Sequence, residues 1–182
     1  MIQFILAGML GYLLGAVPTG VLVCWTLRGA DVRQRGSGHI GGPNVPCVTG
    51  LRGGVRDALL GMAAVAGAGL LTEDPWAATV AGVMAVVGHD WSVLIRFGGG
   101  IGLSKLMGTL LWLDPLRTLG ATIIVAILWL ILVRLLHVHR ARSTILVMLA
   151  AGPLLWALGF PLHTVLLGAL GGMVVIIKTL PD

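Results

Sequence analysis

The chain has 182 residues, of which 57% are hydrophobic and only 10% are charged, and its mean hydropathy is +1.00. Soluble domains carry about 25% charged residues, so this composition excludes a soluble globular protein and indicates an integral membrane protein. The net charge of +5 does not indicate a nucleic-acid partner, because the arginines are scattered at the ends of apolar segments without interleaved aromatic residues.

Charged residues divide the apolar sequence into segments that we expect to be transmembrane helices. The first segment lacks a positively charged start and is longer than the apolar core of a signal peptide, so we expect it to be retained. Several of the others are shorter than the roughly 20 residues that cross a bilayer. The expected fold is an all-α membrane protein of about seven transmembrane helices in one polytopic domain, 1–182, with spans at 2–27, 58–71, 77–95, 103–113, 118–133, 143–160 and 164–177.

The basic residues predict how these helices are oriented. With an N-terminus outside the cell, eleven of the twelve Lys and Arg residues fall on the cytoplasmic side, and only Arg117 falls on the other side. The acidic residues Glu73 and Asp74 lie in an opposite-side loop. This asymmetry follows the positive-inside rule, so we expect an outside N-terminus and a cytoplasmic C-terminus.

Glycines at helix-contact spacing predict where helices pack closely. Gly11 and Gly15 in the first span, and Gly168 and Gly172 in the last, are each separated by four residues. Small residues at this spacing let two backbones approach each other in lipid.

The loop at 33–44 is the most distinctive polar segment of the chain. Its glycines can turn backbone N–H groups toward an anion, Ser37 and Asn44 add neutral donors, and nearby arginines add positive potential. This combination is typical of a phosphate site, and the alternative is a flexible connector whose arginines only fix the membrane orientation. The candidate phosphate-binding residues of this loop are Gly36, Gly38, Gly41, Asn44, Arg33 and Arg35.

Two further features fall on the same expected side of the membrane. The glycine-rich run 96–102 adds Gly99 and Gly102 as candidate phosphate-binding residues. His89 and Asp90 lie near the end of an apolar span, where ionisable residues are functional candidates by default. The alternative is that this pair only marks the end of a helix.

No set of residues has the spacing of a metal site. Cys24 and Cys47 form neither a CxxC motif nor a metal-ligand pattern. His137 and His139, two residues apart on an expected helix, point to different faces. We therefore expect neither a metal nor another cofactor.

Several of these segments are similar to signatures of the bacterial acyl-phosphate:glycerol-3-phosphate acyltransferases, the PlsY family. The resemblance implies seven transmembrane helices in the bacterial cytoplasmic (inner) membrane and acyl transfer from acyl phosphate to glycerol 3-phosphate, with Ser37 and His89 as the catalytic candidates. After residue 115 the resemblance is one of hydropathy only. The similar segments are Gly11 to Gly20, Asp31-Val32-Arg33, Gly36-Ser37-Gly38, Asn44-Val45, Asp57 with Gly61, Gly88-His89, Phe97 with Gly99 and Gly102, and Leu113-Asp114-Pro115.

The chain departs from the family's pattern at groups that would hold the phosphates. An arginine of the family corresponds to Cys47 and a lysine to Leu60, and the two lysines of its second motif correspond to Gly98 and Ile101. The family's C-terminal motif has no counterpart. Each lost charge-assisted contact costs about 1.5–3 kcal/mol, and we expect displaced cations such as Lys105 not to restore the required geometry.

These departures predict a catalytically inactive protein, a pseudoenzyme retained as an accessory or structural subunit of a membrane complex. Its expected partners are membrane lipids and another protein, with no nucleic acid. The alternative is an active glycerol-3-phosphate acyltransferase that works in phospholipid synthesis.

Overall fold

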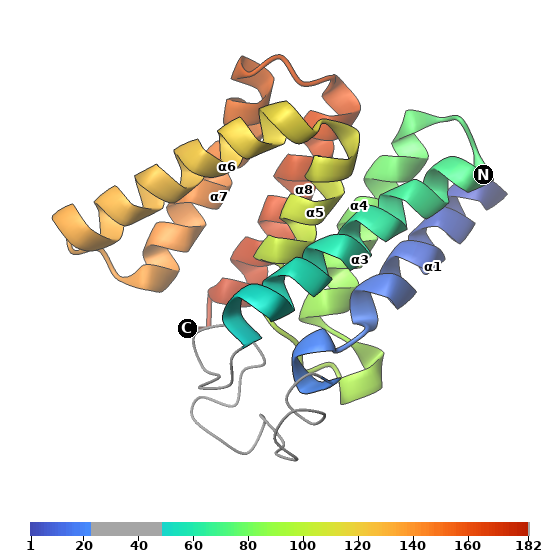
Figure 1. The fold of residues 1–182 in the computed structure, drawn as a ribbon, viewed down its shortest axis with the longest axis horizontal. Coiled ribbons are helices and arrows are strands. Elements are labelled where there is room, and N and C mark those ends of the chain that lie inside the picture. Colours follow the sequence, from blue (N-terminus) through green and yellow to red (C-terminus); the bar gives the residue numbers. More distant parts are fainter. Residues whose placement is uncertain (23–48, 182) are drawn as a thin grey trace.

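The computed structural model describes residues 1–22 and 49–181, and this part of the chain consists of helices joined by short turns. Five helical segments within it are long and apolar enough to cross a membrane, and a sixth apolar helix is shorter. The all-α membrane fold expected from the sequence is therefore confirmed. The helices are α1 (Ile2–Ala16), α3 (Thr49–Leu71), α4 (Pro75–Asp90), α5 (Leu103–Leu113), α6 (Pro115–Leu130), α7 (Arg140–Ala157) and α8 (Leu162–Thr179), shown in Figure 1.

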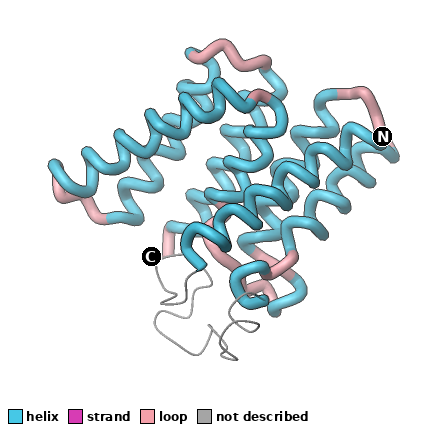
Figure 2. The backbone as a smooth tube through the Cα atoms, viewed as in Figure 1, coloured by secondary structure: helices cyan, strands magenta, loops and turns pink. Residues whose placement is uncertain are grey.

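The helices form a main bundle and a projecting pair. In the bundle, α4 contacts α1, α3, α5 and α8, and α3 also packs along α5. Helices α6 and α7 contact each other and extend away from the bundle, joined to it through α5 and α8 (Figures 1 and 2). The end of α1, the start of α3 and the end of α4 lie close together at one end of the bundle (Figure 1).

Backbone contact between α1 and α4 is made possible by glycine. A Cβ atom on Gly11 or Gly15 would collide with the backbone carbonyl of Ala81 or Ala85, respectively, and one on Gly88 with the carbonyl of Tyr12. The close approach predicted from the spacing of Gly11 and Gly15 is confirmed. Because these contacts join backbones, they fix the end of α1 relative to the end of α4.

The first helix is shorter than expected. Within the predicted span 2–27 the segment Ile2–Leu22 is long and apolar enough to cross a membrane. Its helix is interrupted, because α1 ends at Ala16 and Val17 is extended, with φ −61° and ψ 115°. Pro18 explains the break, since a proline disfavours the α conformation of the residue before it. The chain is helical again at 19–22. This break brings a turn of polar backbone to the end of the bundle.

The starts of other helices also differ from the predicted spans. Asp74 caps α4 by accepting a hydrogen bond from the backbone N–H of Trp76 at 3.0 Å, and Asp114 caps α6 by accepting one from that of Arg117 at 3.0 Å. A proline follows each aspartate at the first helical position, where its missing N–H costs nothing. Helices α4 and α6 therefore begin at Pro75 and Pro115, before the predicted starts at 77 and 118. Helix α3 begins at Thr49 rather than at 58, because the polar residues before 58 continue the helix beyond its apolar part.

Candidate functional site

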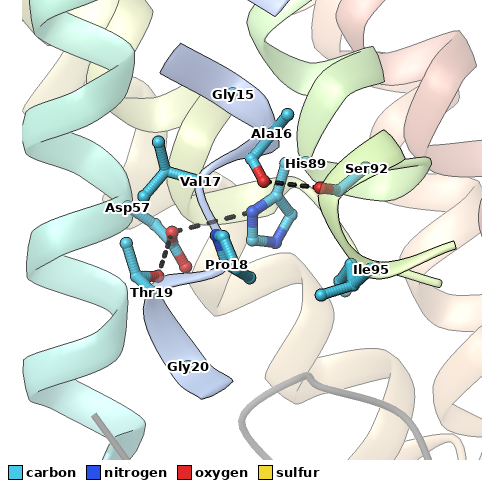
Figure 3. A pocket seen from close by; sticks show the side chains of 12 residues that line it. Gly15, Ala16, Val17, Pro18, Thr19, Gly20, Asp57, His89, Ser92 and Ile95 are labelled. Atoms are coloured by element: carbon cyan, nitrogen blue, oxygen red, sulfur yellow. Dashed lines mark hydrogen bonds and ion pairs between the residues drawn. The ribbon is translucent and has the colours of Figure 1, made fainter. Parts of the chain in front are cut away.

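A pocket lies where the turn after α1 meets α3, the end of α4 and the glycine-rich run (Figure 3). Its empty space, part of which is open to solvent, is about 270 Å³. The lining residues are Gly15, Ala16, Val17, Pro18, Thr19, Gly20, Asp57, His89, Ser92, Ile95, Gly99 and Gly100.

Three polar groups converge on one carboxylate oxygen at this pocket. The hydroxyl of Thr19 donates a hydrogen bond to Asp57 Oδ1 at 2.6 Å, and the ammonium nitrogen of Lys105 lies 3.3 Å from the same oxygen. Nδ1 of His89 lies 3.6 Å from it, so the imidazole faces the carboxylate (Figure 3). The Lys105 side chain is fully buried, whereas those of Asp57 and His89 are 14% and 15% exposed. The pocket wall therefore presents a carboxylate and an imidazole, and a buried cation lies against the carboxylate behind this wall.

Close packing of α3 on α5 brings the carboxylate and the buried cation together. A Cβ atom on Gly61 would collide with the backbone carbonyl of Lys105, and one on Gly108 with that of Ala58. These contacts set Asp57, one turn before Gly61, beside Lys105. A buried ion pair is stable only when its partners are held in good geometry, which the glycine contacts provide.

The segment after α4 is tied to α1 by two side chains. The hydroxyl of Tyr12 donates to the backbone carbonyl of Trp91 at 2.9 Å, and the hydroxyl of Ser92 donates to that of Ala16 at 2.5 Å. Both bonds satisfy carbonyl groups near a helix end, where intrahelical partners run out. They hold the wall of the pocket next to His89.

Helix α8 reaches the same region from the other side. The ammonium group of Lys178 donates to the backbone carbonyl of Asp90 at 2.7 Å and lies 5.3 Å from the centre of the Trp91 ring, within the range of a cation–π contact. The Asp90 side chain is itself fully buried. These contacts tie the end of α4 to α8, and a functional role of His89 and Asp90 stays a prediction.

The glycine-rich run approaches α4 too closely for side chains. A Cβ atom on Gly99 would collide with the backbone carbonyl of His89, and one on Gly100 would lie 2.7 Å from His89 Nε2. At the start of this run, Arg96 and Phe97 adopt left-handed backbone conformations, with φ 57° and 60°. Such conformations cost about 1–3 kcal/mol each for residues other than glycine, and they cluster at functional sites.

The structure brings together only some of the residues that the sequence predicted for the site. His89 and Gly99 line the pocket, whereas Gly102 caps the start of α5, where a Cβ atom would collide with the side chains of Val86 and Asp90. The remaining predicted residues lie outside the described part of the chain and stay predictions: Arg33, Arg35, Gly36, Ser37, Gly38, Gly41 and Asn44.

Sequence reasoning missed the group around Asp57. Asp57 and Thr19 both lie in segments with a family resemblance, but nothing in the sequence showed that they meet. By its position in the sequence Lys105 is a displaced cation, yet it reaches the carboxylate from the first turn of α5. Among the described residues, no three His, Cys, Asp or Glu side chains gather as metal ligands.

Comparisons with known proteins give one consistent result. The family model described as glycerol-3-phosphate acyltransferase matches residues 5–181. A glycerol-3-phosphate acyltransferase of Synechococcus sp. (strain JA-3-3Ab) is 39% identical over 181 residues, which covers 94% of this chain and 84% of that protein. One of Rubrobacter xylanophilus is 37% identical over 177 residues, covering 94% and 85%.

A solved structure shares the fold. The crystal structure of PlsY (YgiH), an integral membrane glycerol 3-phosphate acyltransferase in its glycerol 3-phosphate form, superposes with a TM-score of 0.77 at 25% sequence identity. The match covers 96% of this chain and 87% of that one. The prediction of an inactive accessory subunit is wrong, because relatives that match over nearly the whole chain are named as the enzyme.

Proposed function

Since the chain belongs to the glycerol-3-phosphate acyltransferase family, we propose that it is an active enzyme that transfers an acyl group from acyl phosphate to glycerol 3-phosphate. The products would be lysophosphatidic acid, a precursor of phospholipids, and inorganic phosphate. The observation that carries this proposal is the pocket itself, where Asp57 and His89 meet beside a glycine-rich run while the buried Lys105 pairs with Asp57 from behind the wall. We place the enzyme in the bacterial cytoplasmic membrane as a multi-pass protein with its N-terminus outside.

The pocket suits anionic substrates of this kind. Both substrates carry phosphate groups, which are bound by cations and by backbone N–H groups that glycine leaves accessible. Gly99 and Gly100 line the pocket, and the loop at 33–44 would add Ser37 and its arginines. We assign the phosphate groups to these two glycine-rich segments.

An apolar groove beside the pocket suits the acyl chain. It runs between α1 and α4, and its open volume is about 750 Å³. From Phe4 to Leu13 it follows α1 for about 14 Å at the helical rise of 1.5 Å per residue, and it ends about half a turn before the pocket begins at Gly15. The lining residues are Phe4, Ile5, Gly8, Met9, Tyr12, Leu13, Val80 and Met84.

Two measurements test the proposal. The purified protein should form lysophosphatidic acid from palmitoyl phosphate and glycerol 3-phosphate, and it should restore growth to a bacterium depleted of its own acyltransferase. Ser37→Ala should lower both the product formed and the growth, because the Ser37 hydroxyl is expected to donate a hydrogen bond to phosphate from the loop at 33–44. A folded, monodisperse wild-type protein that gives neither product nor growth would refute the proposal.

A further inference from the structure

The connection between α6 and α7 gathers cations that have no carboxylate partner in the described chain. Arg134, Arg140 and Arg142 are all exposed. The sequence from 115 to 181 contains no Asp or Glu. Within the described part of the chain, no carboxylate lies within ion-pair distance of these three arginines. Their positive charge is therefore not neutralised by any described residue.

The backbone brings these arginines to one place, the α6–α7 tip, which we define as residues 134–142. Helix α6 ends in a π-helical turn, Ile131–Leu135, and the N–H of Leu136 donates to the carbonyl of Ile131 at 3.0 Å. The chain then reverses at His137, whose backbone is left-handed with φ 52°. The α6–α7 tip lies at the far end of the projecting pair, away from the main bundle (Figure 1).

Two of the arginines stand where they do not stabilise their own helix. Arg140 is the first residue of α7 and Arg142 lies in the same turn, which contains no acidic residue and has no side-chain cap. A charge of the favourable sign near a helix end contributes about 0.3–1 kcal/mol, so cations at an N-terminus are unfavourable by a similar amount. An anion bound beside these arginines would offset that cost.

An exposed apolar stripe leads along α6 to the first arginine. An 18-residue window of the span 115–135 is only 11% buried, against 28–50% in the other four candidate spans of the described chain. The exposed residues Ile123, Ile127 and Leu130 are three or four positions apart, so they share one face that continues to Arg134. From Ile123 to Arg134 this stripe measures about 16 Å at the helical rise of 1.5 Å per residue. One leaflet contributes about 15 Å to the hydrocarbon core, so the stripe has the length of one acyl layer.

Exposed leucines at the α6–α7 tip favour a lipid over a soluble anion. Leu135 and Leu136 are 70% and 63% exposed, and they directly follow Arg134. Cations beside exposed apolar side chains are typical of segments that lie between lipid headgroups and acyl chains. The charge asymmetry predicts that the α6–α7 tip faces the cytoplasm, where the leaflet carries anionic lipids.

We propose that the α6–α7 tip binds an anionic phospholipid of the cytoplasmic leaflet. The headgroup phosphate lies against Arg134, Arg140 and Arg142, and the acyl chains lie along the exposed face of α6. This site is separate from the pocket, whose described lining ends at Gly100. The inference goes beyond the proposed acyl transfer and does not depend on it.

Native mass spectrometry of the detergent-purified wild-type protein tests this binding. Dioleoyl phosphatidylglycerol should bind at least about tenfold more tightly than dioleoyl phosphatidylcholine, because both lipids have the same chains and only the first is anionic. Glycerophosphoglycerol, the same headgroup without chains, should not displace the bound lipid at equal concentration. This arm separates a lipid site from a site for soluble phosphate.

Charge-removing variants locate the site. Arg134→Gln should weaken phosphatidylglycerol binding about fivefold, and a variant with all three arginines of the α6–α7 tip changed to Gln should weaken it about a hundredfold. The matched control is Arg56→Gln, which removes one exposed cation from α3 in the main bundle and should leave the affinity unchanged. In hydrogen exchange, phosphatidylglycerol should protect amides at 134–142 in the wild-type protein and not in the triple variant.

Several results would overturn the inference. They are equal affinity of the wild-type protein for the two lipids, wild-type affinity of Arg134→Gln for phosphatidylglycerol, and an Arg56→Gln loss as large as that of Arg134→Gln. Tighter binding of polyglutamate than of phosphatidylglycerol at the α6–α7 tip would also overturn it, in favour of an acidic protein partner. If the triple variant folds poorly, the comparison of Arg134→Gln with Arg56→Gln decides the question.

Discussion

Replacing Gly11 by alanine tests the close contact between α1 and α4 at a position that does not line the pocket. The added Cβ atom would lie 2.8 Å from Ala81 Cα and still nearer to the carbonyl oxygen of that residue, whereas ordinary contact begins at 3.4 Å. Both obstacles are backbone atoms, so no side chain can rotate away. The two helices must separate, and α1 carries the turn that bears Thr19.

The expected loss of stability follows from two opposing effects. Overpacking a close contact costs about 1–3 kcal/mol, and the better helix propensity of alanine returns at most about 1 kcal/mol. The net loss should therefore reach about 2 kcal/mol. For a chain of this size that corresponds to a Tm lower by about 4–8 °C. Acyltransferase activity should fall as well, because Thr19 moves away from Asp57.

The assay is thermal unfolding in a mild detergent beside a matched glycine variant. Gly69 lies on the exposed face of α3, and a Cβ atom there would meet nothing within 4 Å. Gly69→Ala should leave Tm unchanged or raise it. If Gly11→Ala melts at the wild-type temperature with full activity, the helices are not in backbone contact and the reasoning fails.

Three further changes probe the pocket, the apolar groove and the orientation of the chain in the membrane. Gly100→Ala places a methyl group 2.7 Å from His89 Nε2 and should lower kcat at least about tenfold with Tm kept, and an unchanged kcat would contradict the placement of the imidazole. Met9→Trp fills the apolar groove and should reduce the rate with palmitoyl phosphate more than the rate with a short-chain acyl phosphate. The control Leu119→Trp, on the exposed face of α6, should affect the two rates equally. If Met9→Trp also affects the two rates equally, the groove assignment is refuted. A fluorescent reporter fused to the C-terminus should fluoresce and an alkaline phosphatase fusion should be inactive, and the reverse pattern would invert the predicted topology.

Local sequence rules predict much of the fold. Hydropathy indicates the membrane class and the approximate spans, and the Asp-Pro pairs at 74–75 and 114–115 are readable helix starts. The break at Pro18 was also readable, because the rule for the residue before proline is local. The prediction of one long helix failed there because apolar composition was given more weight than that rule.

The arrangement of the site could be predicted only in part. Gly88-His89 stood out because an imidazole near an apolar helix end is rare. The meeting of Asp57 with Lys105 depends on the register of α3 against α5, and hydropathy carries no information about that register. Lys105 therefore matches no lysine of the family by its position in the sequence, although α5 brings its ammonium nitrogen within 3.3 Å of the Asp57 carboxylate.

The bond from Lys178 to the Asp90 carbonyl has a consequence for how the protein is made. It joins residues 88 positions apart, and the lysine belongs to α8, the last helix in chain order. A ribosome has already delivered α1, α3, α4 and α5 to the membrane before α8 emerges. Until then, the backbone next to His89 is tied to α1 through Tyr12 and Ser92 but lacks its bond to α8. Catalytic competence should therefore arise late in biogenesis, when the last helix inserts, and nascent chains that stop before α8 should remain inactive in the membrane.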